Sequence, residues 1–259
     1  MTLPAPNGRD LSGAALRGSG LAQRFGTRTV YRDVTFEVAH GEVFVILGGS
    51  GCGKSTLLRQ CIGLLPPTAG NVSLLGCDIY TATPAARAEV LHRIGVMFQS
   101  GALFGSMTLL ENVMLPLEVH TDLPPAARRR VARLKLGLVG LADAAPLLPA
   151  EISGGMAKRA AIARALALDP PLLFLDEPSA GLDPVTSAGL DRLILELRRD
   201  LGLTFVVVTH ELASILAIAD RCLMLDRNVQ GVIAAGDPRR LRDESTDPTV
   251  RGFFRREAA

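Results

Sequence analysis

The chain has 259 residues, 48% of them hydrophobic, which is enough for one large core or a core with a smaller lobe. Its 28 basic and 26 acidic residues leave a formal net charge of +2 without long blocks of like charge, so no electrostatic footprint for nucleic acid stands out. The four cysteines show neither a C-x-x-C spacing nor histidine pairing, so neither a zinc site nor a disulfide framework is indicated, and a reducing cytosol fits best.

The N-terminal part predicts strands after a loose start. Residues 1–18 are rich in proline and glycine, so we expect a poorly ordered segment, with regular structure beginning near Leu21. Apolar and polar residues alternate over 34–38, which predicts a strand with one buried face. Phe25 lies on an early strand or loop, where it either stacks on a purine or serves as a core or hairpin aromatic. No apolar run approaches the ~18 residues that cross a bilayer, and residues 1–20 lack a signal-peptide pattern, so we expect neither a span nor that route of export.

A glycine-rich loop follows the apolar strand predicted at 43–47 and leads into a helix that begins near Lys54. It fits the pattern G-x-x-x-x-G-K-[ST], in which backbone N–H groups and the positive end of the helix surround a phosphate. Lys54 can reach the β- and γ-phosphates, and the Ser55 hydroxyl can bind the Mg²⁺ that bridges them. The pattern therefore predicts a nucleoside triphosphate site. Its residues are Gly48, Gly49, Ser50, Gly51, Cys52, Gly53, Lys54, Ser55 and Thr56.

The next segment predicts a strand at 71–76, a helix at 84–91 and a compact strand at 94–98 that ends in Gln99. Ligands of α/β sheets gather at the carboxyl ends of the strands. The Gln99 amide could therefore contact Mg²⁺ or the attacking water, although a solvated cap is the alternative for an isolated glutamine.

Residues 100–170 change character, because helices are predicted at 111–119 and 125–137 while strand signals are absent. This region reads as a helical lobe inserted between sheet strands. Ser153, Gly154 and Gly155 then begin another helix with small residues. Such a start either accepts a phosphate or is a plain N-cap, and the local sequence favours neither.

The last strands end in polar residues. The buried strand at 172–175 leads to Asp176 and Glu177, which could divide the work, Asp176 holding Mg²⁺ through water and Glu177 polarising the attacking water. Asp183 lies in the tight turn that follows. The strand at 204–208 ends near His210, which either bonds the γ-phosphate and fixes the acid or is an N-cap or surface histidine. A closing hairpin is predicted at 222–234.

These sites, in this order, resemble the nucleotide-binding subunit of ATP-binding cassette (ABC) transporters over residues 19–236. The resemblance implies an α/β fold: a P-loop NTPase (RecA-like) core with a mixed sheet, a small antiparallel β subdomain and an inserted helical subdomain. The core and β lobe would comprise residues 19–99 and 171–236, and the helical subdomain residues 100–170. Residues 237–259 would form a C-terminal tail. The resemblance rests on Phe25, the glycine loop, Gln99, Ser153, Gly154, Gly155, Asp176, Glu177 and His210.

The resemblance also implies roles and partners. ATP and Mg²⁺ are the expected cofactors, with Glu177, His210 and Gln99 catalytic and with Ser55, Gln99 and Asp176 on the metal. A second copy of the chain would complete each site, so that Ser153-Gly154-Gly155 of one copy grips the γ-phosphate held by the P-loop of the other. Asp183 would link the two sites across the seam.

One departure sharpens the match, because Met156 stands where the family usually has Gln. Together with the stretches 98–104, 116–121 and 247–253, the 152–159 stretch is similar to the subfamily that powers Mla-type and Mce-type lipid transporters. This implies a permease in the membrane, an MCE-type lipid-binding subunit, and a peripheral place on the cytoplasmic face of the bacterial inner membrane. A small accessory cytoplasmic subunit is a further implied partner.

The resemblance implies one contact surface, and the apolar residues near the C-terminus suggest another. Leu103, Phe104 and Met107 are either the contact for a permease helix or buried within the helical lobe. Val250, Phe253 and Phe254 are expected to dock on a neighbouring subunit.

The alternatives for the whole chain are an importer of amino acids or other small polar solutes and, from another class, a cassette protein that acts on DNA or ribosomes. No basic stripe or second cassette favours the latter, and no nucleic-acid partner is expected.

Overall fold

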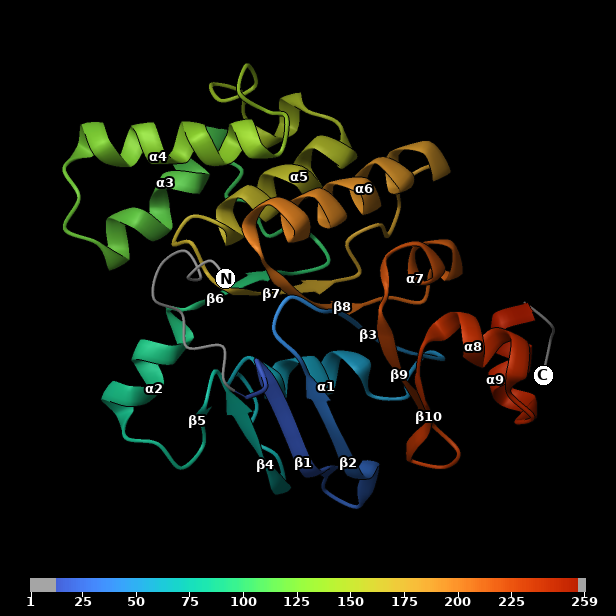
Figure 1. The fold of residues 1–259 in the computed structure, drawn as a ribbon. Coiled ribbons are helices and arrows are strands. Elements are labelled where there is room, and N and C mark those ends of the chain that lie inside the picture. Colours follow the sequence, from blue (N-terminus) through green and yellow to red (C-terminus); the bar gives the residue numbers. More distant parts are fainter. Residues whose placement is uncertain (1–12, 256–259) are drawn as a thin grey trace, which may run out of the picture.

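The computed structural model describes residues 13–255, and the N-terminal expectation for residues 1–12 lies outside them. Two sheets form the framework (Figure 1). The larger sheet has the order β10-β9-β3-β8-β7-β6, and only β10 runs antiparallel to its neighbour. Its strands are β3 (Val43–Gly48), β6 (Ile94–Met97), β7 (Leu172–Asp176), β8 (Thr204–Val208), β9 (Arg221–Asp226) and β10 (Gly231–Gly236).

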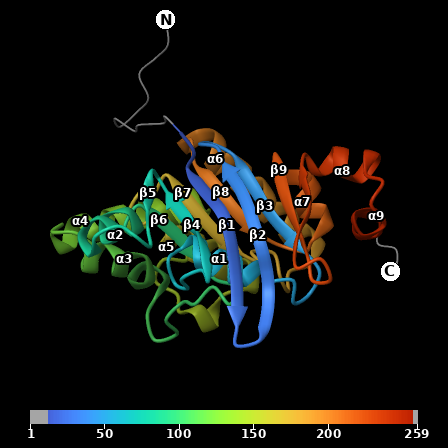
Figure 2. The same cartoon turned by 90° about the horizontal axis from the view of Figure 1, so that it is seen from below.

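The smaller sheet is antiparallel and has the order β2-β1-β4-β5. Figure 2 shows its strands lying across the larger sheet, with the C-terminal helices and the helical lobe at opposite edges of the molecule. The mixed sheet, the antiparallel sheet and the helical insertion confirm the expected fold class. The four strands are β1 (Leu16–Phe25), β2 (Arg28–Val38), β4 (Ala69–Leu74) and β5 (Cys77–Asp78).

Alternating side chains of the central strands build two cores, one on each face of the larger sheet. Along β3, Phe44 and Ile46 point toward the antiparallel sheet and α1 (Lys54–Cys61), whereas Val45 and Leu47 point toward the helical face. The strand is buried over its full length, as expected for a parallel strand covered on both sides. The order of the central sheet brings the carboxyl ends of β3, β6, β7 and β8 to one edge, where the polar residues after each strand collect.

The helical lobe lies between β6 and β7, and residues 98–171, all of which are described, contain no strand. Thr108 and Glu111 form a capping box at the start of α3, and the backbone N–H groups of Leu109 and Leu110 bond to the carbonyls of Leu147 and Ala145. The helices of this region are α3 (Leu109–His120), α4 (Pro125–Leu138), the short 3₁₀ helix at Pro149–Glu151, and α5 (Gly154–Ala165). The remaining helices are α2 (Pro84–Leu91), α6 (Pro184–Leu201), α7 (Leu212–Ile218), α8 (Pro238–Glu244) and α9 (Pro248–Arg255).

Two expectations about the ends are wrong. Regular structure begins at Leu16, not near Leu21, because Gly18 sits in β1 under the Phe36 ring, where a Cβ would lie 2.6 Å from a ring carbon. The expected docking of Val250 and Phe254 on a neighbouring subunit is also wrong. Both side chains are buried in the core of their own chain, on the inner face of α9.

Candidate active site

The glycine loop leaves the N-terminus of α1 without a side-chain cap. The N-cap residue is Gly53, whose φ of 105° is in the left-handed region that glycine tolerates. Gly48 has a φ of 143°, and a Cβ there would lie 2.2 Å from the Leu225 carbonyl oxygen. The Lys54 Nζ donates to the carbonyl oxygens of Gly48 and Gly49 at 2.8 and 3.1 Å. The loop therefore presents free backbone N–H groups, a helix dipole and an ammonium at one point.

A cavity of about 380 Å³ lies over this loop. It brings Phe25, Gln99 and Glu177, which come from three distant parts of the sequence, next to the P-loop. Phe25 is 51% exposed, so it is not a core aromatic and its ring is free to stack on a flat ligand. The lining residues are Phe25, Arg28, Val30, Ser50, Gly51, Gly53, Lys54, Ser55, Thr56, Gln99 and Glu177.

The acidic pair lies at the carboxyl end of β7. The Asp176 Oδ1 and Glu177 Oε2 atoms are buried and have no hydrogen-bond partner among the described residues. Burial raises the pKa of Asp176, a nearby Glu177 carboxylate raises it further, and the charges of Arg59, Lys54 and Lys158 lower it. Unpartnered buried carboxylate oxygens are costly unless a cation or a water pairs with them, so this pair fits a site for Mg²⁺ and a water.

His210 contacts Glu177 directly. Its Nδ1 lies 2.8 Å from the Glu177 Oε1, while 63% of the His210 side chain is exposed. The backbone of Glu177 has a φ of 48°, which is uncommon for a residue with a side chain, and its N–H donates to the Val208 carbonyl oxygen at 2.8 Å. One carboxylate oxygen is thus held by the histidine and the other remains free for a reacting group.

The start of α5 does not share this cavity, because none of Ser153, Gly154 and Gly155 lines it. The Ser153 Oγ accepts a hydrogen bond from the Met156 N–H at 3.2 Å, so Ser153 is an N-cap. Ser153 and Gly154 are exposed, and Gly155 is packed against α6.

Asp183 caps α6 in a similar way. Its Oδ1 accepts from the N–H groups of Val185 and Thr186, both at 3.0 Å. The hydrogen bonds with Thr186 lower the pKa of Asp183. Asp183 is therefore an exposed, ionised cap beside the start of α5, and it does not line the cavity over the P-loop.

Lys158 on α5 is absent from the residues that the sequence predicts for the site. The residue is 8% exposed, and its Nζ donates to the Gln99 carbonyl oxygen and, at 3.4 Å, to the Glu177 carbonyl oxygen. From the sequence alone, Lys158 would be expected to be an exposed cation on the surface of a helix. Its burial depends on a loop 59 positions away, so no local signal identifies it.

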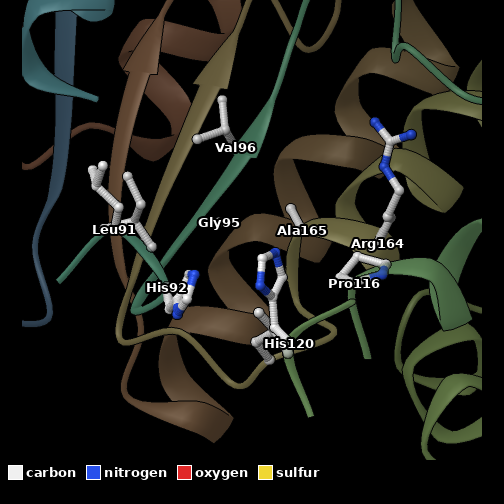
Figure 3. Close-up of a pocket in the computed structure, with 10 residues that line it drawn as sticks. Leu91, His92, Gly95, Val96, Pro116, His120, Arg164 and Ala165 are labelled. Carbon is white, nitrogen blue, oxygen red and sulfur yellow. The ribbon is translucent and has the colours of Figure 1, made fainter. Parts of the chain in front are cut away.

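Two further cavities lie where the helical lobe meets β6, and Figure 3 shows the smaller of them. Cavities of about 200 and 400 Å³ share Pro116, His120 and Arg164, so we describe them as one groove. The His92 and His120 rings meet there with centroids 4.3 Å apart. Phe104 and Val119 present exposed apolar surface, 50% and 63% exposed. No helix within residues 13–255 has the length and apolar character that a bilayer crossing requires.

The sequence profile of the family described as ABC transporter matches residues 31–180. The intermembrane phospholipid transport system ATP-binding protein MlaF of Escherichia coli is 42% identical over 230 residues, which are 88% of this chain and 84% of that protein. The probable ribonucleotide transport ATP-binding protein mkl of Mycobacterium leprae is 41% identical over 248 residues, 96% of this chain and 71% of that protein.

Solved structures show the same fold. The cbiO1 protein of Clostridium perfringens, described as part of an ABC transporter complex, superposes with a TM-score of 0.81 at 28% identity, covering 90% of this chain and 92% of that one. A dimeric, post-hydrolysis structure of the ATP-binding cassette MJ0796 bound to ADP and Pi superposes with a TM-score of 0.76 at 30% identity. It covers 86% of this chain and 98% of that chain.

Proposed function

Because the chain belongs to the ABC transporter family and is an ATPase of that family, we propose that it powers phospholipid transport through a separate membrane permease. The observation that carries the proposal is the cavity that joins a P-loop to Gln99 and Glu177. The lipid cargo is supported by the similarity to MlaF, whose name states intermembrane phospholipid transport.

The residues of the cavity divide the work on ATP. The uncapped start of α1 and Lys54 hold the phosphates, and Phe25 stacks on the adenine. Ser55, Gln99 and Asp176 would hold Mg²⁺, and the unpartnered Asp176 Oδ1 fits that assignment. When bound, the ion neutralises charge on the β- and γ-phosphates.

We assign to Glu177 the role of accepting a proton from the attacking water. Its Oε1 is held by the His210 Nδ1, which leaves Oε2 for the water. His210, being 63% exposed on its side chain, can also bond the γ-phosphate. Gln99 also lines the cavity, so its amide is available to orient the same water.

The second half of each site would come from a second copy of the chain. The start of α5 is exposed and lies outside the cavity, so it has no ligand within its own chain. Two-fold pairing would bring Ser153, Gly154 and Gly155 of one copy to the phosphates held by the other, with Asp183 at the seam. The similarity to MJ0796, whose structure is described as dimeric with ADP and Pi, supports this arrangement.

The permease would dock in the groove between β6 and the helical lobe. Phe104 is exposed there, whereas Leu103 packs on the core and Met107 is half-buried, so Phe104 is the strongest of these three contacts. An apolar helix of an integral membrane protein suits the exposed side chains of Phe104 and Val119. We extend the proposal to an MCE-type lipid-binding subunit, a small accessory subunit, and a peripheral location on the cytoplasmic face of the inner membrane.

Mixed dimers of two full-length variants test the shared site. Lys54→Ala damages the P-loop and Ser153→Ala damages the start of α5, so each pure variant has two defective sites. A dimer that contains one chain of each keeps one intact site. We expect such dimers, isolated through two different tags, to hydrolyse ATP well above either pure variant.

The matched control places both substitutions in one chain and pairs it with the wild-type chain. If each site is shared between copies, this dimer has no intact site and stays inactive. The reverse pattern, with the double variant paired with wild type active and the mixed single variants inactive, would place the whole site within one chain and overturn the proposal.

The cargo is tested by extracting the chain with its partners from membranes in mild detergent. We expect an integral membrane protein and bound phospholipid, and phospholipid-dependent ATP turnover after reconstitution. A complex that responds to ribonucleotides instead, in line with the name of the mkl relative, would replace the lipid assignment.

A further inference from the structure

Lysine and arginine together number 28 in this chain, and only three of them are lysines, at positions 54, 135 and 158. Lysine carries a compact charge on a slim stem, whereas arginine carries a planar fork, so the two are not interchangeable at tight sites. Each lysine bonds inward. Lys54 contacts two P-loop carbonyls, Lys135 pairs with the Asp169 carboxylate at 2.5 Å, and Lys158 contacts two carbonyls beside the candidate catalytic side chains.

Lys158 connects two residues that line the cavity and follow neighbouring strands of the sheet. Its Nζ reaches the carbonyl oxygens of Gln99, after β6, and Glu177, after β7. Burial lowers the pKa of Lys158, and the nearby charges of Glu177 and Asp176 offset part of that effect. The Glu177 backbone has a left-handed φ and is held on its other side by Val208, so the lysine completes the restraint on that residue.

The same helix holds the rest of the Gln99 segment. The Arg164 guanidinium, at the far end of α5, donates to the carbonyl oxygens of Gly101 and Ala102 at 3.0 and 2.6 Å. Arg164 also lines the groove beside His120 (Figure 3). The backbone of residues 99–102 is therefore tied to α5 at two points, one next to Glu177 and one next to the groove.

We propose that Lys158 is a positioning residue that sets the distance between Gln99 and Glu177 and so determines how well they orient the attacking water. The inference rests on the catalytic roles proposed above and adds a residue to them. The hydrogen bonds of Lys158 to these two residues go to their backbone carbonyls and not to their side chains. Lys158 therefore affects the chemical step more than it affects the binding of ATP.

The test compares steady-state ATP turnover of the full chain with Lys158→Met, which keeps the stem and removes the charge and the donors. We expect kcat to fall about tenfold or more, with KM for ATP within about twofold of wild type. Lys158→Arg keeps a cation that donates to carbonyls, but its planar fork does not match the contacts of the compact ammonium, so it should recover only part of the loss. Thermal melts show whether each variant is folded.

Two further variants separate the outcomes. Lys135→Met removes the other buried ammonium of the helical lobe, and it should lower the melting temperature while kcat stays within about twofold of wild type. Glu177→Gln tests the catalytic assignment itself and should abolish turnover. Wild-type turnover in Glu177→Gln would reject the proposed function, whatever Lys158 does.

If Glu177→Gln is inactive and folded Lys158→Met turns over like wild type, the inference about Lys158 alone is wrong. It is equally wrong if Lys158→Met and Lys158→Arg both lose kcat and raise KM in parallel, because that pattern indicates general distortion. Should Lys158→Met not fold, Lys158→Leu serves in its place, since it also lacks both the charge and the donors. A reduced kcat with unchanged KM supports the inference, and an unchanged kcat overturns it.

Discussion

Two helices of this chain begin with small residues, yet their first turns differ. The start of α1 follows Gly53, has no side-chain cap, and opens into the cavity beside Lys54. The start of α5 follows Ser153, whose Oγ caps the Met156 N–H, and it lies on the surface outside that cavity. Both offer helix dipoles and backbone donors to an anion, but only α1 offers them at a site that its own chain builds.

The neighbours of each helix start account for the difference. Gly48 and Gly53 let the backbone of the P-loop pass close to Leu225 and Tyr31, which leaves the N–H groups turned toward the cavity. Gly155 instead lets α5 pack against Thr186 on α6, which leaves Ser153 at the exposed end. A glycine-rich helix start therefore indicates that the backbone packs closely against a neighbour. The packing around it decides whether the helix start is open to a ligand held by its own chain or by another chain.

The largest expected effect comes from removing the ammonium at α1. Lys54→Ala should weaken ATP binding by about 10- to 100-fold, because a charge-assisted contact with the phosphates is lost while the loop remains. Titration of a fluorescent ATP analogue measures the affinity. Ser153→Ala, the corresponding change at α5, should leave that affinity of the single chain nearly unaltered.

The two variants control for each other, since each removes one polar side chain from the start of a helix, Lys54 directly after the N-cap of α1 and Ser153 at the N-cap of α5. Equal affinity for ATP in Lys54→Ala and wild type would contradict the phosphate assignment of α1. A similar loss in both variants would instead mean that α5 contributes to the first binding event within one chain.

A smaller effect is expected from adding one methyl group to the start of α5. A Cβ on Gly155 would lie 2.4 Å from the Thr186 Cγ2, and Thr186 cannot easily move, because its Oγ1 bonds to the Asp183 Oδ2 at 2.5 Å. Gly155→Ala should therefore destabilise the fold by about 1–3 kcal/mol. For a chain of this size each kcal/mol lowers the melting temperature by about 2–4 °C.

Gly154→Ala is the matched control, because the nearest atom to its added Cβ is 3.8 Å away on Leu182. Its melting temperature should stay within about 1 °C of wild type or rise, since alanine favours a helix over glycine. Identical melting of Gly155→Ala and wild type would show that α5 and α6 are not packed closely at this point.

Much of the fold follows from the sequence, because buried parallel strands are apolar runs that end in polar residues. Both faces of β3, β7 and β8 are covered, and the apolar sequence of each strand is sufficient to predict it. The start of β1 is not, because Gly18 resembles a loop residue while it permits close contact with Phe36. At the C-terminus, the apolar residues show that α9 needs a surface, but not that the surface belongs to the same chain.

The candidate site also contains residues that the sequence predicts and one that it does not. The P-loop, Gln99 and Glu177 are recognisable because each follows a strand, and parallel strands bring their carboxyl ends together. Lys158 is not recognisable, because its role depends on the contact between α5 and the segment after β6. The sequence shows which groups could do the chemistry, whereas the packing shows which groups hold them in place.

The smallest expected effect is at Met156, where the family usually has glutamine. The bond that closes the first turn of α5 comes from the Met156 backbone N–H, so it survives any side chain there. The Met156 side chain is partly buried against the helical core, and a glutamine of similar length would carry an amide into that contact. Met156→Gln should change ATP turnover by less than about threefold, with Met156→Leu as the apolar control. If Met156→Gln instead turned over ten times faster while Met156→Leu did not, the prediction would be wrong. The rate of the wild-type chain would then be limited by the lack of a hydrogen bond that the glutamine amide supplies.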